Sequence, residues 1–268
     1  MKVITFYSPK GGIGKSNTCI QLTQELASQG YKVLAIDGDP QSNLTSSLYK
    51  INLDKEKTLM NLFVDDLEAK DLIVNCKENI DLIANDISSI ILAEKISYLN
   101  NREKRFGIWC NRNKEYLYKY DYILIDTNCS FDLVAKNLII ASDTVISIVA
   151  HSDFDSIKGA SLFASLKESL LKDLEFEDDF VKYYVLLNRH KNTNTNMSKL
   201  FDRTLKNYKN VKDKMLDTFI SESVFISEST LIRKTSVDDL LKNKKIKNNK
   251  VQGQYKKLIQ ELKEKDVM

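Results

Sequence analysis

The sequence predicts an α/β fold in which helices cover both faces of a mostly parallel, twisted sheet. Short apolar runs rich in β-branched residues alternate with stretches of helical periodicity, as in successive β-α-β units. Only two prolines and eight glycines occur in 268 residues, and no Pro/Gly-rich linker or internal repeat divides the chain. We therefore expect a single domain over residues 1–268. The expected strands are KVITFY, KVLAID, IDLIA, YDYILID, DTVISIVA and KYYVLLN.

The composition is typical of a globular protein from a reducing compartment. Hydrophobic residues make up 43% of the chain, enough to form a core. The formal net charge is +3, so binding to an anionic partner would depend on local clusters of charge. The four cysteines show no C-x-x-C spacing. Because the apolar start VITFY is too short for a signal peptide, we predict a cytoplasmic protein.

The first strand, expected near residues 2–7, leads into a glycine-rich loop and then a helix over residues 15–29. Cys19, Leu22 and Leu26 follow helical spacing in this helix. A strand, a glycine-rich loop and a helix form a cradle for polyphosphate. Glycines let backbone N–H groups approach the oxygens, the helix N-terminus adds positive potential, and a lysine neutralises charge. The sequence therefore predicts a nucleotide-binding loop.

This loop, SPKGGIGKSN, departs from the ordinary phosphate-binding motif. Pro9 stands where that motif has its first glycine, and Lys10 adds a second lysine close to Lys15. The pattern Lys-Gly-Gly-x-Gly-Lys-Ser resembles the deviant Walker A motif of the ParA/MinD family of ATPases. The resemblance implies a P-loop NTPase in which Lys10 reaches across a dimer interface to the partner's nucleotide, where phosphates relieve the repulsion between the lysines. The alternative is a glycine-rich turn with incidental lysines. The implied ATP-binding residues of the loop are Lys10, Gly11, Gly12, Ile13, Gly14, Lys15, Ser16 and Asn17.

Carboxylates follow two of the expected strands. Asp37 and Asp39 end the second strand, facing the crevice where α/β proteins bind ligands. Their segment resembles the family's Asp-x-Asp-Pro-Gln, which implies that Asp37 helps to organise the Mg²⁺ shell and that Asp39 positions or activates the attacking water. Asp126 ends YDYILID like a Walker B carboxylate that holds Mg²⁺ through water, and Ser16 would bind Mg²⁺ directly. The alternative for the pair is a turn and a helix cap.

The loop after Asp126 reads Thr-Asn-Cys-Ser, whereas the family usually has Thr-Pro-Pro-Ser. An aspartate followed three residues later by a cysteine, here Cys129, also resembles the nitrogenase iron protein, whose dimer bridges an iron–sulfur cluster. Such a cluster needs a second thiolate in a glycine-rich loop. Cys76 and Cys110 lack glycine-rich surroundings, so we favour a structural role for Cys129.

The resemblance extends over nearly the whole chain. Residues 54–115 are expected to be helical apart from IDLIA. VLLN resembles the strand whose end borders the adenine, which makes Asn188 the base-contacting candidate, and Ser221 replaces a proline at the adenine wall. A C-terminal helix is expected over residues 252–265.

Basic residues supply the candidates for DNA binding. Glu222 and Phe225 stand where ParA proteins that hold nucleoid DNA often have basic residues, so DNA contacts must come from other clusters. A solvated face is the alternative interpretation of each cluster. The candidates are Lys199, Arg203 and Lys206 on one expected helix, Arg233 and Lys234, and Lys242, Lys244, Lys245 and Lys247 in a lysine-rich loop over residues 242–250.

The resemblance is closest to the Soj-like ParA partition ATPases, without an N-terminal helix-turn-helix domain. It implies a Mg²⁺-dependent ATP hydrolase with weak basal activity. ATP would close a homodimer that holds nonspecific DNA, and a ParB-like partner would stimulate hydrolysis and release it. The alternative is a MinD-like positioning ATPase that acts on a membrane or a protein cargo. The narrow apolar stripe of the C-terminal helix, from Tyr255 to Leu262, favours docking on the core over binding lipid.

Overall fold

The computed structural model describes residues 1–49, 57–177, 180–191, 195–247 and 249–268, except for the side chains of residues 231 and 233. Its centre is an eight-stranded sheet in the order β3-β4-β2-β5-β1-β6-β7-β8. All neighbouring strands in this sheet are parallel except β3 and β4, which pair antiparallel. The strands are β1 (Lys2–Phe6), β2 (Val33–Gly38), β3 (Val74–Lys77), β4 (Ile80–Ile83), β5 (Tyr122–Thr127), β6 (Thr144–Ala150), β7 (Lys182–His190) and β8 (Met215–Ser221).

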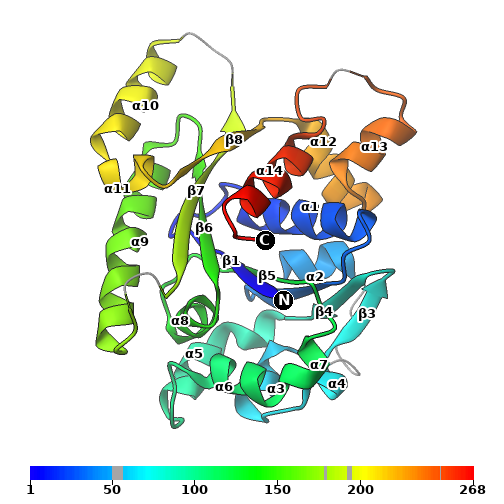
Figure 1. The fold of residues 1–268 in the computed structure, drawn as a ribbon, viewed down its shortest axis with the longest axis vertical. Helices are drawn as coiled ribbons and strands as arrows, with labels where there is room; N and C mark the ends of the chain where they lie inside the picture. The colour runs from blue at the N-terminus through cyan, green and yellow to red at the C-terminus, as the bar shows by residue number, and fades with distance from the viewer. Residues whose placement is uncertain (50–56, 178–179, 192–194, 248) are drawn as a thin grey trace.

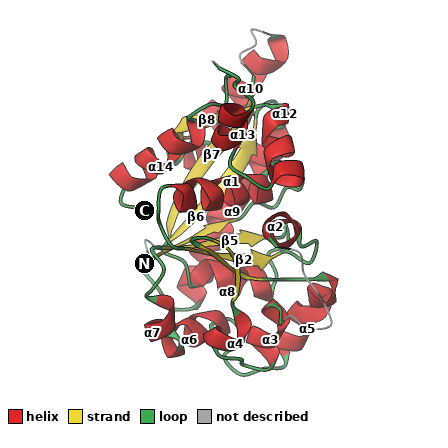
Figure 2. Cartoon of the chain, turned by 90° about the vertical axis from the view of Figure 1, so that its right-hand side faces the viewer, coloured by secondary structure: helices red, strands yellow, loops and turns green. Residues whose placement is uncertain are grey.

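Helices pack on both faces of the sheet (Figures 1 and 2). One face carries α1 (Lys15–Ser28), α2 (Asn43–Leu48), α12 (Val224–Ser227), α13 (Val237–Asn243) and α14 (Gln254–Glu264). The opposite face carries α3 (Leu59–Val64), α4 (Ala69–Leu72), α5 (Leu92–Ser97), α6 (Arg105–Arg112), α7 (Lys114–Leu117), α8 (Leu133–Ile140), α9 (Phe154–Asp173), α10 (Asn196–Asn207) and α11 (Lys209–Lys212). A 3₁₀ turn, η1 (Ile87–Ile91), precedes α5, and a π-helical turn, η2 (Glu228–Arg233), follows α12.

Along each central strand, successive side chains point alternately into the hydrophobic cores on the two faces of the sheet. In β1, Ile4 and Phe6 pack under α1, whereas Val3 faces the opposite core. Every residue of β2 and β5 is buried, because helices cover both of their faces. The predicted single-domain α/β fold is confirmed, and the first helix ends within one residue of its expected limit.

Residues 54–56 of the expected helical region 54–115 lie outside the described residues, and over residues 57–115 the structure differs from the expectation in one element. β3, expected to be helical, is a strand that forms a hairpin with β4 at the edge of the sheet. Its four residues, VNCK, contain a single β-branched side chain, and none of them is fully buried. Pairing with β4, rather than an apolar pattern of its own, therefore stabilises this strand. The expected lysine-rich loop also differs slightly, because α13 extends through Asn243 and includes Lys242.

The C-terminal helix α14 docks on the sheet as expected. Tyr255, Leu258, Ile259 and Leu262 are all buried in the core under α1 and β8. Glu261 fixes the register of this contact, because its two carboxylate oxygens accept hydrogen bonds from the backbone N–H groups of residues 217 (2.7 Å) and 218 (2.8 Å) in β8. None of the described helices combines the length and apolar character needed to cross a bilayer.

Replacing Glu261 by alanine is expected to lower the free energy of unfolding by about 1–3 kcal/mol, since two backbone N–H groups in a partly buried contact lose a charged acceptor. Burial alone would raise the pKa of Glu261, but these backbone hydrogen bonds lower it overall, so the carboxylate is ionised at neutral pH. Urea denaturation measures the change. Glu264→Ala on the exposed side of the same helix is the control, and an equal effect of both substitutions would contradict this role of Glu261.

Candidate functional site

The candidate site lies at the carboxyl ends of the central strands, where the loop after β1 turns into α1. Gly14 caps α1 with a positive φ of 99°, and a Cβ atom at this position would collide with the side-chain amide of Asn188. Asn188 donates a hydrogen bond from Nδ2 to the carbonyl of the buried Ile13 at 2.8 Å. The end of β7 therefore holds the glycine-rich loop in place.

The two lysines of the loop have different environments. Lys15 is buried, and its Nζ atom donates to the carbonyl oxygen of Lys10 at 3.1 Å and to Cys129 Sγ at 3.2 Å. The Lys10 side chain is 42% exposed, and its Nζ atom lies 3.8 Å from Asp155 Oδ2 on α9. A pair of exposed charges at this distance stabilises little, because water and salt screen it. In the single chain, Asp155 therefore compensates the charge of Lys10 only in part and holds its side chain weakly.

Two buried aspartates lie beneath the loop on adjacent strands. Asp37 in β2 and Asp126 in β5 are partners in the strand register, and both are fully buried. Asp37 accepts hydrogen bonds from the backbone N–H and the hydroxyl of Thr45, both at 2.8 Å, and from the N–H of Asp39 at 3.1 Å. Burial nevertheless raises the pKa of Asp37 to about 6.

Asp126 is less well satisfied. Neither of its carboxylate oxygens has a partner with good hydrogen-bond geometry among the described residues, although the Ser16 hydroxyl lies near enough to lower its pKa. Burial and the charge of Asp37 raise the pKa of Asp126 well above its usual value, while the nearby Ser16 and Lys15 act in the opposite direction. A buried carboxylate without a partner is costly.

These residues fit a Mg²⁺ ion bound together with a nucleotide. The described residues contain no cluster of three or more His, Cys, Asp or Glu side chains placed to hold a metal ion. Mg²⁺ rarely needs such a cage, because it keeps several waters and takes one or two protein oxygens plus phosphate oxygens. The Ser16 hydroxyl and the unpaired Asp126 carboxylate offer ligands of that kind.

Asp39 is placed differently from the two buried acids. It is partly exposed, and its Oδ1 atom accepts a hydrogen bond from the N–H of Gln41 at 2.9 Å. The intervening Gly38 lets β2 approach β5 closely, because a Cβ atom there would lie 2.7 Å from the carbonyl oxygen of Asp126. The sequence Asp-Gly-Asp thus buries one carboxylate and directs the other toward the cavity.

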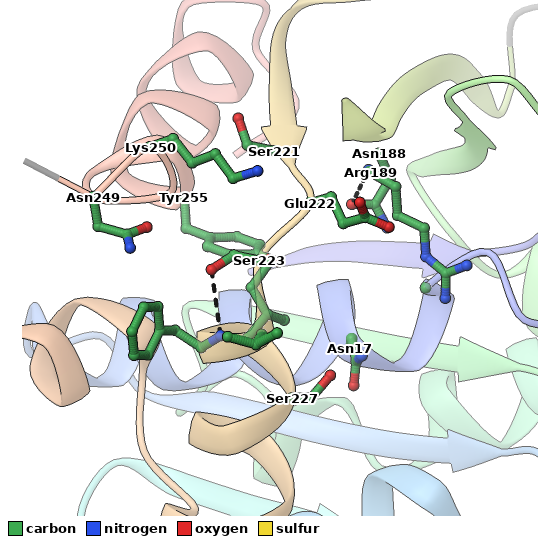
Figure 3. Close-up of a pocket in the computed structure, with 14 residues that line it drawn as sticks. Asn17, Asn188, Arg189, Ser221, Glu222, Ser223, Ser227, Asn249, Lys250 and Tyr255 are labelled. Carbon is green, nitrogen blue, oxygen red and sulfur yellow. Dashed lines mark hydrogen bonds between the residues drawn. The ribbon is translucent and has the colours of Figure 1, made fainter. Parts of the chain in front are cut away.

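Two neighbouring cavities surround the loop. The one of about 410 Å³ is lined by the loop glycines, Lys15, Ser16, Asp39 and Cys129. The one of about 660 Å³ is lined by Asn188, Ser221, Glu222, Phe225 and Tyr255, among others (Figure 3). Both share Gly14, Asn17 and Arg189, so together they form a continuous site, one end of which lies at the glycine-rich loop and the other at the ends of β7 and β8.

The predicted nucleotide-site residues gather at this site, and three further residues were not predicted. Arg189 lines both cavities and has a left-handed φ of 53°. A basic residue directly after the end of the expected strand KYYVLLN was the signal that could have identified it. Cys129 contacts Lys15 rather than serving only as a buried structural thiol. Asp155 pairs with Lys10, and nothing in the linear sequence connects these two residues.

The DNA-binding candidates separate into different surroundings. Lys199, Arg203 and Lys206 are exposed on one side of α10, and none of them forms an ion pair with a described residue. Lys244, by contrast, lies 2.6 Å from Glu228, and Lys234 donates to the carbonyl of residue 46 at 2.9 Å. Lys242, Lys245 and Lys247 are exposed near the end of α13. The side chain of Arg233 lies outside the described part of the structure.

Comparison with known proteins gives consistent matches. A family model described as an AAA domain matches residues 1–176. The sporulation initiation inhibitor protein Soj of Bacillus subtilis is 31% identical over 229 residues, covering 85% of this chain and 87% of Soj. A plasmid partition protein from Borrelia burgdorferi bound to AMPPNP has a TM-score of 0.77 at 25% identity, covering 98% of this chain and 99% of that one. An ATP complex of Cyanothece McdA has a TM-score of 0.81 at 22% identity, covering 98% and 96%, and shows the same fold.

The unpaired carboxylate of Asp126 predicts that Asp126→Asn stabilises the nucleotide-free protein. Burial raises the pKa of Asp126, so at pH 8, above the usual pKa of an aspartate in the unfolded chain, folding must either bury the charge or protonate the carboxyl group. Asparagine avoids this cost, and we expect the free energy of unfolding to rise by about 1–3 kcal/mol. Urea denaturation without nucleotide or Mg²⁺ measures this. The control is Asp39→Asn, because Asp39 is partly exposed and hydrogen-bonded. Equal stability of wild type and Asp126→Asn would show that the carboxylate is satisfied in solution.

Proposed function

The chain belongs to the ParA/MinD-type ATPase family, and from this membership and the geometry of the site we propose a specific function. It is a Mg²⁺-dependent ATP hydrolase with weak basal turnover that acts as a dimerising switch in plasmid or chromosome partition. The proposal depends on one observation: the two lysines of the loop differ in burial and in the groups that they contact. Lys15 is buried inside the end of the site at the glycine-rich loop, whereas Lys10 is exposed at its rim.

The roles within one subunit follow from this placement. Backbone N–H groups of the glycine-rich loop and the N-terminus of α1 bind the phosphates, and Lys15 exchanges its contacts with Cys129 and the Lys10 carbonyl for phosphate oxygens. Ser16 and Asp126 would hold Mg²⁺, which when bound would supply positive charge beside the phosphate oxygens. Asp39, at the cavity surface, orients the attacking water.

A second copy of the chain completes the site. Lys10 cannot stay close to Lys15 without repulsion, and its pair with Asp155 is weak. A triphosphate bound in a partner subunit offers Lys10 a much stronger, desolvated contact. ATP thus favours the dimer, because the phosphates bound in one subunit interact both with Lys15 of that subunit and with Lys10 of the other.

DNA and a ParB-like protein are the proposed partners. The exposed cations of α10 are available to phosphates, and a dimer presents them twice, which suits nonspecific, salt-dependent binding. Hydrolysis stimulated by the ParB-like partner would open the dimer and release DNA. The apolar stripe of α14 is buried against β8, which favours DNA over the membrane of a MinD-like positioning ATPase. Retention on DNA-cellulose with ATP, compared with pelleting on liposomes, separates the two functions.

Lys10→Ala is expected to bind ATP with little loss yet to stay monomeric and lose turnover at least about tenfold. Sedimentation with AMPPNP and Mg²⁺ measures the dimer, and phosphate release measures turnover. The matched control is Lys158→Ala, which removes the other lysine paired with Asp155. Normal hydrolysis by Lys10→Ala would refute its role across the interface. Lys15→Ala should abolish nucleotide binding itself.

Neutralising α10 with Lys199→Gln, Arg203→Gln and Lys206→Gln should weaken binding to nonspecific DNA in the ATP state. The logarithm of the DNA-binding constant falls linearly with the logarithm of the salt concentration. If all three side chains contact phosphates in both subunits, the slope of this line becomes less steep by about 5. Fluorescence anisotropy at several salt concentrations measures the slope. Lys70→Gln, Lys95→Gln and Lys114→Gln together remove the same charge elsewhere. Equal effects of both triple variants would mean that net charge, rather than α10, governs the binding.

A further inference from the structure

A third cavity, of about 130 Å³, lies on the far side of the loops that form the nucleotide site. Asp39 and Cys129 line the nucleotide cavity, whereas their sequence neighbours Pro40, Asn128 and Ser130 line the small one. Its remaining walls come from the end of β2, the start of α3, the residues before η1, η1 itself, the start of α5, and the N-cap and first turn of α8. A molecule in this cavity would touch the loop of Asp39 and the loop after Asp126 together.

The cavity contains a polar side chain that the protein itself leaves unsatisfied. Asn85 is 1% exposed and lines the cavity, yet neither the oxygen nor the nitrogen of its side-chain amide has a hydrogen-bond partner among the described residues. Its backbone N–H, by contrast, donates to Thr45 Oγ1 at 3.0 Å. Leaving a buried amide unpaired costs free energy, so the site favours a ligand that can pair with it.

An exposed apolar surface borders the same cavity. Ile87, Ile90 and Ile91 are 61%, 69% and 47% exposed; the i, i+3 spacing places Ile87 and Ile90 on one face of η1, and Ile91 follows Ile90. We call these three residues the isoleucine ridge. Ile90 also lines the cavity, so the ridge and the unpaired amide belong to one surface. Clustered exposed apolar side chains of this kind mark interaction sites.

The charge of the cavity limits what can bind. Its lining includes one carboxylate, Asp132, and no Lys, Arg or His. Asp132 caps α8 through the N–H of Ala135 at 3.0 Å, which keeps its charge in place. Nucleotides, inorganic phosphate and acidic peptides would be repelled. A peptide group presents one N–H donor and one carbonyl acceptor, the complement of the two unpaired atoms of Asn85.

We propose that the small cavity and the isoleucine ridge form a docking site for a neutral or basic polypeptide segment of a partner protein. A backbone amide of the segment pairs with Asn85, and an adjacent apolar side chain packs on Ile90. This inference deepens the proposed function and rests on it for the role of the partner, which is stimulation of hydrolysis. Because the docked segment contacts both loops of the ATP site, its binding is linked to the nucleotide state.

The test uses a defined probe, N-acetyl-leucine N-methylamide, added to the nucleotide-free, ¹⁵N-labelled full chain. We expect saturable changes in the Asn85 side-chain amide signals, with a dissociation constant of about one millimolar for a fragment of this size. N-acetyl-aspartate N-methylamide should bind at least about tenfold more weakly. The Asn85 signals are assigned from their absence in Asn85→Leu.

Two variants distinguish binding at this site from nonspecific binding to exposed apolar side chains. Ile90→Asp, on an exposed residue, should weaken the leucine probe at least about tenfold. The matched control Ile232→Asp replaces an isoleucine of equal 69% exposure on η2 and should bind as wild type does. Asn85→Leu should also lose binding, and Ile90→Asp keeps the test decisive if that buried variant does not fold.

The outcomes divide cleanly. Saturable binding lost in Ile90→Asp and kept in Ile232→Asp supports the docking site. Absence of saturable binding overturns it, since solvent alone then satisfies Asn85. Equal binding of the aspartate probe, or signal changes that follow protein concentration and so report self-association, overturns it as well. Because no nucleotide is present, a negative result leaves the ATPase proposal standing, and a failed ATPase assay leaves this result unchanged.

Discussion

The site depends on like charges that the fold holds close together on both sides of one loop. Asp37 and Asp126 are buried as register partners beneath the loop, and Lys10 and Lys15 lie within it. On the acidic side, burial raises the pKa of both aspartates, and the charge of Asp37 raises the pKa of Asp126 further. In the function proposed above, Mg²⁺ would complement the carboxylates and a triphosphate would complement the lysines. A single ligand complex would then offset both concentrations of like charge and stabilise the state that binds it.

The rest of the fold keeps this arrangement from relaxing. Gly38 admits a close approach of β2 and β5, so Asp37 cannot move away from Asp126 without separating two central strands. The amide of Asn188 fixes the loop from β7 through the carbonyl of Ile13. Helix α14 covers α1 and is tied to β8 through Glu261. The packing of these elements stabilises the fold and so offsets the cost of the closely spaced charges at the carboxyl ends of the central strands, as is common for functional sites.

The loop motif and the fold class could be predicted because their signals are local. Glycines, a lysine and a strand–loop–helix order are adjacent in sequence, and buried parallel strands are uniformly apolar. β3 was missed because its stability comes from pairing with β4 rather than from its own residues. Arg189 and Asp155 were missed as site residues for a related reason. Arg189 lines a cavity with the glycine-rich loop, and Asp155 pairs with Lys10 of that loop. Each residue is more than a hundred positions from the loop in the chain, and only the folded sheet brings them together.

The loop after Asp126 connects the nucleotide site to the small cavity, and its sequence suits that position. Where the family pattern has two prolines, this chain has Asn128 and Cys129. Asn128 shapes the turn by accepting the N–H of Ser130 at 2.9 Å and contacts Asp132 at 3.3 Å, so side-chain hydrogen bonds replace the rigidity of proline rings. Hydrogen bonds at a partly exposed loop exchange readily, whereas proline rings do not. Side-chain hydrogen bonds thus shape the loop between the two cavities, and within this loop Cys129 accepts a hydrogen bond from Lys15 at 3.2 Å.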